Sequence, residues 1–176
     1  MNITRYSVTN YDYATSRSYE DLVAAFEQAV ADAENGQVAK ALAEAQNAGQ
    51  WESALGRLFG PSGFVRTFSM DHGRWLSFYG APAKAKKYVY GNPVVAETML
   101  RHDVRAGLQL PLSLLIYENK QGKGCISFDL PSTLTSFTHQ LDLTSAAQAL
   151  DAKLLAFVEQ LVGAAPEPAP PGTPGQ

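Results

Sequence analysis

The spacing of apolar residues predicts secondary structure along most of the chain. Residues 2–8 alternate between two sides, with Ile3 on one and Val8 on the other, which predicts an opening strand. Residues 19–30 place apolar side chains at helical spacing, and Ser18 just before them is a favourable N-cap. We therefore expect a strand followed by a helix that packs one face against an apolar layer.

Residues 35–60 are predicted to form an inserted helical hairpin. Its first part, residues 36–46, is rich in alanine and weakly amphipathic, so we expect a peripheral helix. Its second part has an apolar face that includes Leu55, and it ends at Gly60 and Pro61, which are typical of a helix stop.

Residues 64–70 alternate again and predict a second strand, but residues 71–80 are open to two interpretations. One is a hairpin turn over residues 71–73. The other, which we favour, is a short helix, because Asp71 is a strong N-cap and a glycine and a proline downstream supply a stop. Gly73 in the first turn counts against the helix, because glycine is a poor helix former.

The second half of the chain predicts more strands with short helices between them. Strands are expected at residues 86–90, 111–119 and 124–131, and the last two are joined by residues 120–123, which include the glycine that such a hairpin needs. Asn92 as N-cap and Pro93 as first helical residue predict a short helix over residues 94–103.

A long closing helix is the strongest amphipathic segment. Ser145 and Gln148 resemble a capping box at its start. Its apolar face comprises Leu150, Leu154, Phe157, Val158 and Leu161. The order strand, helix, four strands and helix, with extra short helices inserted, predicts an α+β fold: an antiparallel-rich curved sheet with the long helices packed on one face.

Composition narrows the possible partners. A net charge of -3 disfavours nucleic acid, because binding to phosphates needs a basic surface. No apolar run is long enough to span a membrane or resembles a signal peptide, so we expect no membrane partner and a cytoplasmic location. The single cysteine, Cys125, excludes an internal disulfide and a multi-cysteine metal site. No cofactor is evident.

The composition changes sharply at residue 164. Residues 164–176 are rich in proline and poor in apolar residues, which predicts a disordered tail. We therefore expect a single folded α+β domain over residues 1–163.

Two motifs in the middle of the chain resemble those of a known family. Residues 91–93 read Gly-Asn-Pro before a short helix, and residues 110–112 read Leu-Pro-Leu in a strand that ends near Tyr117 and Glu118. The chain therefore resembles the domain-of-unknown-function family 302, in a variant with longer helical inserts. The resemblance implies a fold similar to that of the TATA-binding protein and a homodimer, and it brings no established activity. Such a fold does not imply DNA binding.

His72 and His102 are the first candidates for chemistry. If they share a pocket with acidic neighbours, they would form a nitrogen and oxygen metal site or a general acid–base pair. Each also has a structural explanation, because His72 lies at a predicted helix start and His102 near a predicted helix end.

Three further residues are candidate ligand contacts. Glu118 closes an apolar strand and would be functional if it pointed inward, although strand ends are usually exposed to solvent. Arg105 could bind an anion or pair with Asp103. Asn92 at a helix start could help to bind an anion or simply form the turn.

No nucleophile or phosphate-binding motif is present in the sequence. The sequence is compatible with three functions: a module that binds a small apolar ligand or a partner segment, a metal- or haem-binding protein or enzyme built on His72 and His102, and a structural homodimeric interaction protein. We favour the first.

Overall fold

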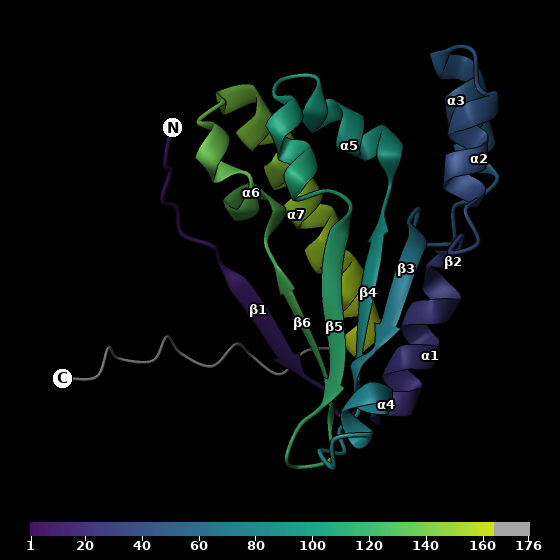
Figure 1. Ribbon diagram of the computed structural model, residues 1–176, viewed down its shortest axis with the longest axis vertical. Helices are drawn as coiled ribbons and strands as arrows, with labels where there is room; N and C mark the ends of the chain where they lie inside the picture. Colours follow the sequence, from purple (N-terminus) through teal and green to yellow (C-terminus); the bar gives the residue numbers. More distant parts are fainter. Residues whose placement is uncertain (164–176) are drawn as a thin grey trace.

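The chain folds around a six-stranded sheet (Figure 1). The computed structural model describes residues 1–163, so the predicted tail at residues 164–176 lies outside the described residues. The strands are β1 (Asn10–Ala14), β2 (Ala31–Asp32), β3 (Val65–Asp71), β4 (Ala85–Gly91), β5 (Leu112–Glu118) and β6 (Gly124–Asp129). The helices are α1 (Tyr19–Ala29), α2 (Gln37–Glu44), α3 (Ala48–Gly56), α4 (His72–Ser77), α5 (Pro93–Leu100), α6 (Pro131–Leu134) and α7 (Leu141–Val162), with short 3-10 segments η1 (Val104–Leu108) and η2 (Ser136–Thr138).

The sheet is mixed but mostly antiparallel. Its strand order is β1-β6-β5-β4-β3-β2, and the two-residue β2 runs parallel to β3, whereas the other neighbouring strands are antiparallel. The predicted α+β class and the antiparallel-rich sheet are therefore confirmed. Of the described helices, none is long and apolar enough to cross a membrane.

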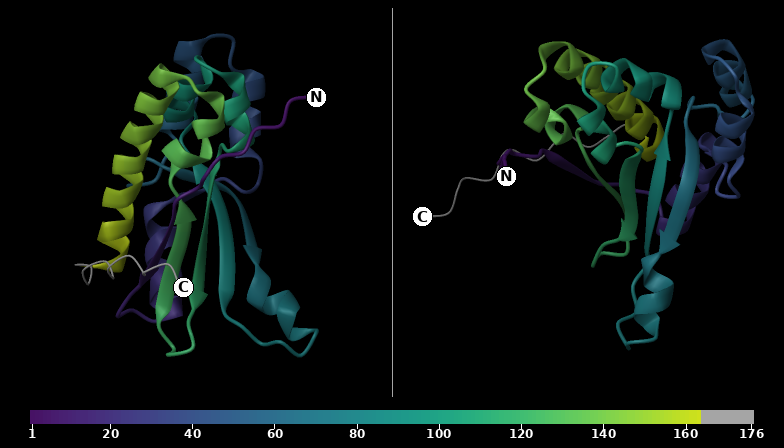
Figure 2. Two further views of the ribbon diagram at one scale, coloured as in Figure 1. Left: turned by 90° about the vertical axis from the view of Figure 1, so that its left-hand side faces the viewer. Right: turned by 45° about the horizontal axis from the view of Figure 1, so that its top comes forward.

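The core lies between one face of the sheet and the helices α1 and α7 (Figure 2). Tyr88 and Tyr90 of β4 alternate with outward residues, and both are fully buried against Phe26 of α1. The apolar face predicted for the closing helix is confirmed, because Leu150, Leu154, Phe157, Val158 and Leu161 are all buried.

The predicted opening strand is wrong. Residues 2–8 are exposed and form no strand, and β1 begins at Asn10. Alternation continues through Tyr11 and Tyr13, and these rings stack on Phe128 of β6. A strand forms where its inward side chains meet apolar partners, so β1 is set by the tyrosines and not by the weaker pattern before them.

The predicted end of the helical hairpin is also wrong. Helix α3 ends at Gly56, four residues before Gly60. A side chain at Gly60 would lie 2.6 Å from the carbonyl oxygen of Ala29, so this glycine permits the chain to pass close to the end of α1.

The closing helix begins one turn earlier than predicted. It starts at Leu141, and the hydroxyl of Ser145 donates to the carbonyl oxygen of Leu141 inside the helix, so Ser145 is not an N-cap. Leu143 and Ala147 are fully buried and extend the apolar stripe toward the N-terminus, which explains the earlier start.

The favoured helix at residues 71–80 is confirmed in its first part. The side chain of Asp71 accepts from the backbone N–H of Arg74 at 2.9 Å, and α4 then runs to Ser77. Only glycine fits at position 73, because a side chain there would lie 2.2 Å from the carbonyl oxygen of Ala83. The glycine therefore lets α4 pack tightly against the start of β4.

Candidate functional site

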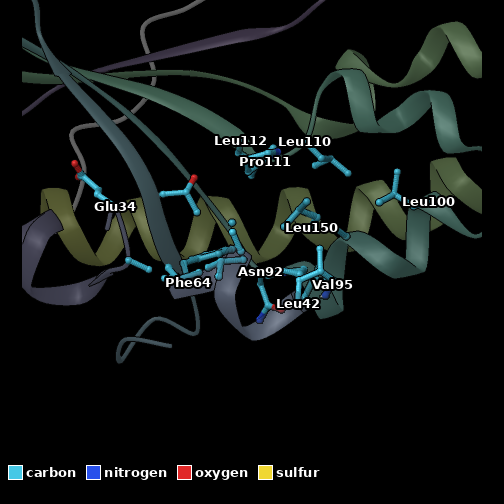
Figure 3. A pocket seen from close by; sticks show the side chains of 18 of the residues that line it. Glu34, Leu42, Phe64, Asn92, Val95, Leu100, Leu110, Pro111, Leu112 and Leu150 are labelled. Atoms are coloured by element: carbon cyan, nitrogen blue, oxygen red, sulfur yellow. Dashed lines mark hydrogen bonds between the residues drawn. The ribbon is translucent and has the colours of Figure 1, made fainter. Parts of the chain in front are cut away.

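An apolar cavity of about 510 Å³ lies between α2, α5 and the ends of β3 to β5 (Figure 3). Its walls come from several elements and their adjoining loops and include Val38, Leu42, Phe64, Val95, Leu110 and Leu150. In the view of Figure 3, Leu110 and Pro111 lie on one side, Leu42 and Val95 lie on the other, and Leu150 of α7 lies between them.

Helix α2 leaves its wall of the cavity open to solvent. It carries no buried residue, and Leu42 remains 62% exposed although it lines the cavity. The next helix, by contrast, buries one side chain completely, because Leu55 of α3 is fully buried. Leu42 thus presents apolar surface to water, at a cost of roughly 25 cal/mol for each Å² that a ligand would cover.

Asn92 shapes the cavity at the N-terminus of α5. Its Oδ1 accepts from the backbone N–H groups of Val94 and Val95 at 2.9 and 3.2 Å, and its Nδ2 donates to the carbonyl oxygen of Gly63 at 2.8 Å. The predicted N-cap is therefore confirmed. Both polar atoms of the side chain are occupied, so Asn92 contributes geometry to the cavity.

Gly91 allows two walls of the cavity to approach each other. A Cβ atom at this position would lie 3.2 Å from Cβ of Pro111, which is tighter than ordinary contact. The Gly-Asn-Pro and Leu-Pro-Leu segments therefore face each other across β4 and β5, where Tyr90 pairs with Leu112. Their packing positions the cavity wall.

The polar side chains at one end of the cavity form hydrogen bonds with one another. Glu34 accepts from Nε of Arg66 at 2.8 Å and from the hydroxyl of Ser69 at 3.1 Å, and Arg66 also donates to Asp32 at 2.8 Å. Burial alone would lower the pKa of Arg66, but the hydrogen bond to Glu34 and the charge of Asp32 raise it overall. Among the described lining residues, Glu34 alone is charged, and both of its oxygens have partners.

Comparison with known proteins decides the family. The model of the family described as "Domain of unknown function DUF302" matches residues 41–161, which is more than half of the chain. The chain belongs to the DUF302 family. No curated protein matches it in sequence.

A solved DUF302 structure shares the fold. It is described as "Crystal structure of uncharacterized conserved protein DUF302 from Bacillus stearothermophilus", and it matches with a TM-score of 0.61 and 16% sequence identity. The match covers 86% of this chain and 97% of that chain. The DUF302 match begins inside α2, so Leu42 lies within it and Val38 lies before it.

The structure places His72 and His102 at opposite ends of the DUF302 sheet. His72 begins α4 after the end of β3, and His102 follows α5 after the end of the antiparallel strand β4. Nδ1 of His72 accepts from the indole N–H of Trp75 at 3.1 Å. In residues 1–163 there is no group of three or more histidine, cysteine or acidic residues that could hold a metal ion.

Arg105 and Glu118 are both engaged in ion pairs. Arg105 donates to both carboxylate oxygens of Asp103, and these hydrogen bonds lower the pKa of Asp103. Glu118 accepts from Lys84 at 2.9 Å at the α4 end of the sheet. Of the residues singled out in the sequence, Asn92 lines the cavity, whereas His72, His102, Arg105 and Glu118 do not.

The sequence did not reveal the cavity-lining residues of α2. Val38 and Leu42 are the two larger apolar residues of an alanine-rich helix that was expected to be peripheral. Their spacing of four residues places both side chains on one face of α2. That spacing was a signal that this face lies against another part of the protein.

Proposed function

We propose that this DUF302 protein binds a small, neutral, predominantly apolar molecule in the cavity between α2 and α5. The observation that carries the proposal is the exposed Leu42 in the wall of a cavity of about 510 Å³. Ligand sites commonly range over roughly 300–1,000 Å³ and have mostly apolar walls with a few polar groups.

The polar groups of the cavity favour a neutral ligand. Glu34 would repel an anion, and its oxygens already accept from Arg66 and Ser69. A cationic ligand would have to displace Arg66, which is itself held by Asp32. The apolar surface is therefore the main source of binding free energy.

Binding is a better match to this site than catalysis. The described lining residues include no histidine, cysteine, lysine or serine, and the one lining carboxylate, Glu34, is held by Arg66 and Ser69. The homodimer and the cytoplasmic location expected from the sequence stay predictions.

The proposal is tested by thermal unfolding of the whole chain with a panel of neutral apolar compounds that differ in length. A compound that binds the folded state raises the melting temperature, and the stabilisation grows with the logarithm of its concentration above Kd. Leu42→Ala removes part of the wall, so we expect a weakening of roughly tenfold for the best compound. Leu141→Ala is the matched control, because Leu141 is an exposed leucine that does not line the cavity.

Either of two results would count against the proposal. The first is a panel in which no compound shifts the melting temperature. The second is an equal loss of binding in Leu42→Ala and Leu141→Ala, which would place the binding surface elsewhere.

A further inference from the structure

The end of the sheet opposite the cavity carries a cluster of exposed aromatic side chains. Phe78 is 78% exposed, Tyr79 is 80% exposed and Trp75 is 41% exposed. The rings of Trp75 and Tyr79 lie edge to face with centroids 6.3 Å apart. We call these three residues the aromatic tip.

The aromatic tip projects beyond the strands. Helix α4 and the loop after it stand out from the end of the sheet in both views of Figure 2. The segment is nonetheless fixed, because Asp71 caps α4 and Gly73 packs against the backbone of Ala83. The start of α4, which carries the tip, is therefore held against the chain just before β4.

Three exposed cations lie at the same end of the sheet as the aromatic tip. Strand β3 ends where β4 begins and β5 ends where β6 begins, so α4 and the turn at residues 119–123 share one end of the sheet (Figure 1). Arg74, Lys120 and Lys123 are exposed at this end, and within residues 1–163 none of them forms an ion pair.

The nearby carboxylates are only partly compensated. Glu20 and Glu118 share Lys84 at 2.9 Å, which leaves one negative charge, and Asp71 accepts from the backbone of Arg74, which leaves its charge in place. The exposed cations Arg74, Lys120 and Lys123 outnumber these two negative charges, although the whole chain has a net charge of -3.

A convex aromatic surface flanked by cations matches a lipid bilayer better than a protein. A specific protein interface buries roughly 800 Å² on each partner and needs a complementary shape, which a six-residue helix offers poorly. The headgroup region of a bilayer adapts to the shape of the tip. Tryptophan and tyrosine favour this region, and lysine and arginine favour anionic headgroups.

We propose that the aromatic tip inserts into the interfacial region of an anionic membrane while Arg74, Lys120 and Lys123 contact its headgroups. The chain then binds the membrane from one side. This proposal departs from the sequence-based expectation of no membrane partner. That expectation rested on the absence of an apolar run long enough to span a bilayer, and an interfacial contact requires no such run.

The first test uses the whole chain in a Trp51→Phe background, which leaves Trp75 as the fluorescent indole. Vesicles of phosphatidylcholine mixed with phosphatidylserine should shift the emission of Trp75 to shorter wavelength and sediment with the protein. Vesicles of phosphatidylcholine alone should bind at least tenfold more weakly, because they lack the charge that attracts the lysines.

Two paired variants locate the contact. Phe78→Ser with Tyr79→Ser should weaken vesicle binding more than tenfold, whereas Val104→Ser with Leu108→Ser should leave it unchanged. Val104 and Leu108 are equally exposed but lie in η1 after α5, at the other end of the sheet. Lys120→Gln with Lys123→Gln should weaken binding roughly tenfold and reduce its dependence on salt.

The proposal is overturned if anionic vesicles leave the emission of Trp75 unchanged at low salt, which is also the result expected if the tip binds a protein. It is equally overturned if the Val104 and Leu108 variant loses as much binding as the Phe78 and Tyr79 variant. All of these positions are exposed, so unchanged melting temperatures will show that the variants fold. The lysine variant tests the proposal independently of the aromatic substitutions.

Discussion

The two ends of the sheet both expose apolar side chains, but in opposite shapes. At the α2 end, Leu42 lines a hollow that α5 and the β-strand ends complete. At the α4 end, Phe78 and Tyr79 are exposed on the segment that follows α4, which stands out from the sheet (Figure 2). A cavity can enclose a small molecule, whereas a projecting segment can insert only into a deformable partner such as a lipid bilayer. Exposure of apolar side chains alone therefore does not identify the partner.

The two ends also differ in what holds them in place. In the hairpin of α2 and α3, Leu55 of α3 is fully buried, so we expect apolar packing to hold it. The α4 end is attached to α1 through polar contacts, because Glu20 pairs with Lys84 and Glu27 accepts from Lys86 and Tyr88, both at 2.7 Å. Apolar anchoring and ion pairing respond differently to mutation and to pH, so the comparison can be tested.

The largest effect is expected from truncation of the hairpin anchor. Leu55→Ala should lower the free energy of unfolding by about 2–5 kcal/mol, because it removes buried methyl groups and leaves a cavity. Leu42→Ala on α2 should change it by less than about 0.5 kcal/mol, because that side chain is already exposed. Urea unfolding of both variants measures the contrast. A large loss in Leu42→Ala would mean that Leu42 is a packing residue and would remove the argument for a ligand.

A smaller effect is expected from the glycine beneath the aromatic tip. Gly73→Ala would force a new Cβ atom against the carbonyl oxygen of Ala83, so we expect a loss of about 1–3 kcal/mol in stability. Gly56→Ala is the control, because no atom lies within 4 Å of the new Cβ and alanine favours helices. Equal stability of the two variants would show that α4 is not packed tightly against β4.

The smallest effect is a pH dependence at the α4 end. Burial raises the pKa of Glu27, but hydrogen bonds from Lys86 and Tyr88 outweigh it and lower the pKa below its usual 4.5. For Glu20, the hydrogen bond from Lys84 is the main cause of a lowered pKa. Because both folded-state pKa values are lowered, their stabilisation is present above about pH 4.5 and is lost as the pH falls through the folded values.

Glu27→Gln should therefore flatten the loss of stability between neutral and acidic pH. Glu52→Gln is the control, because Glu52 is exposed on α3 and forms no ion pair within residues 1–163. Urea unfolding at several pH values measures both variants. If Glu27→Gln leaves the pH profile of the wild type intact, the contact between α1 and β4 is not a source of acid sensitivity.

The sequence predicts correctly those elements whose apolar side chains, spaced along one face, all pack into the core. The stripe of α7 and the cap at Asn92 are local patterns, and both were predicted correctly. The start of α7 was misplaced because Ser145 suits an N-cap locally, whereas burial of Leu143 decides the boundary. Gly60 was mistaken for a helix stop. Its close approach to Ala29 is a tertiary contact, which the local sequence does not show.

The cavity could not be predicted from the sequence. Its walls come from α2, from the ends of β-strands and from α7. Leu42 and Leu150 therefore line the same cavity only when the chain has folded. The two histidines failed as a pair for the same reason, because the antiparallel course of β3 and β4 carries them to opposite ends.

Binding to a cavity-filled variant tests the central claim most directly. Ala39 and Ala43 are both exposed on α2, but Ala39 lines the cavity and Ala43 does not. The neutral dye Nile red, titrated into wild type, Ala39→Phe and Ala43→Phe, reports on the cavity through its fluorescence. We predict saturable binding to wild type and Ala43→Phe and a loss of at least tenfold in Ala39→Phe. Equal affinity for the two phenylalanine variants would contradict the assignment of the cavity as a binding site.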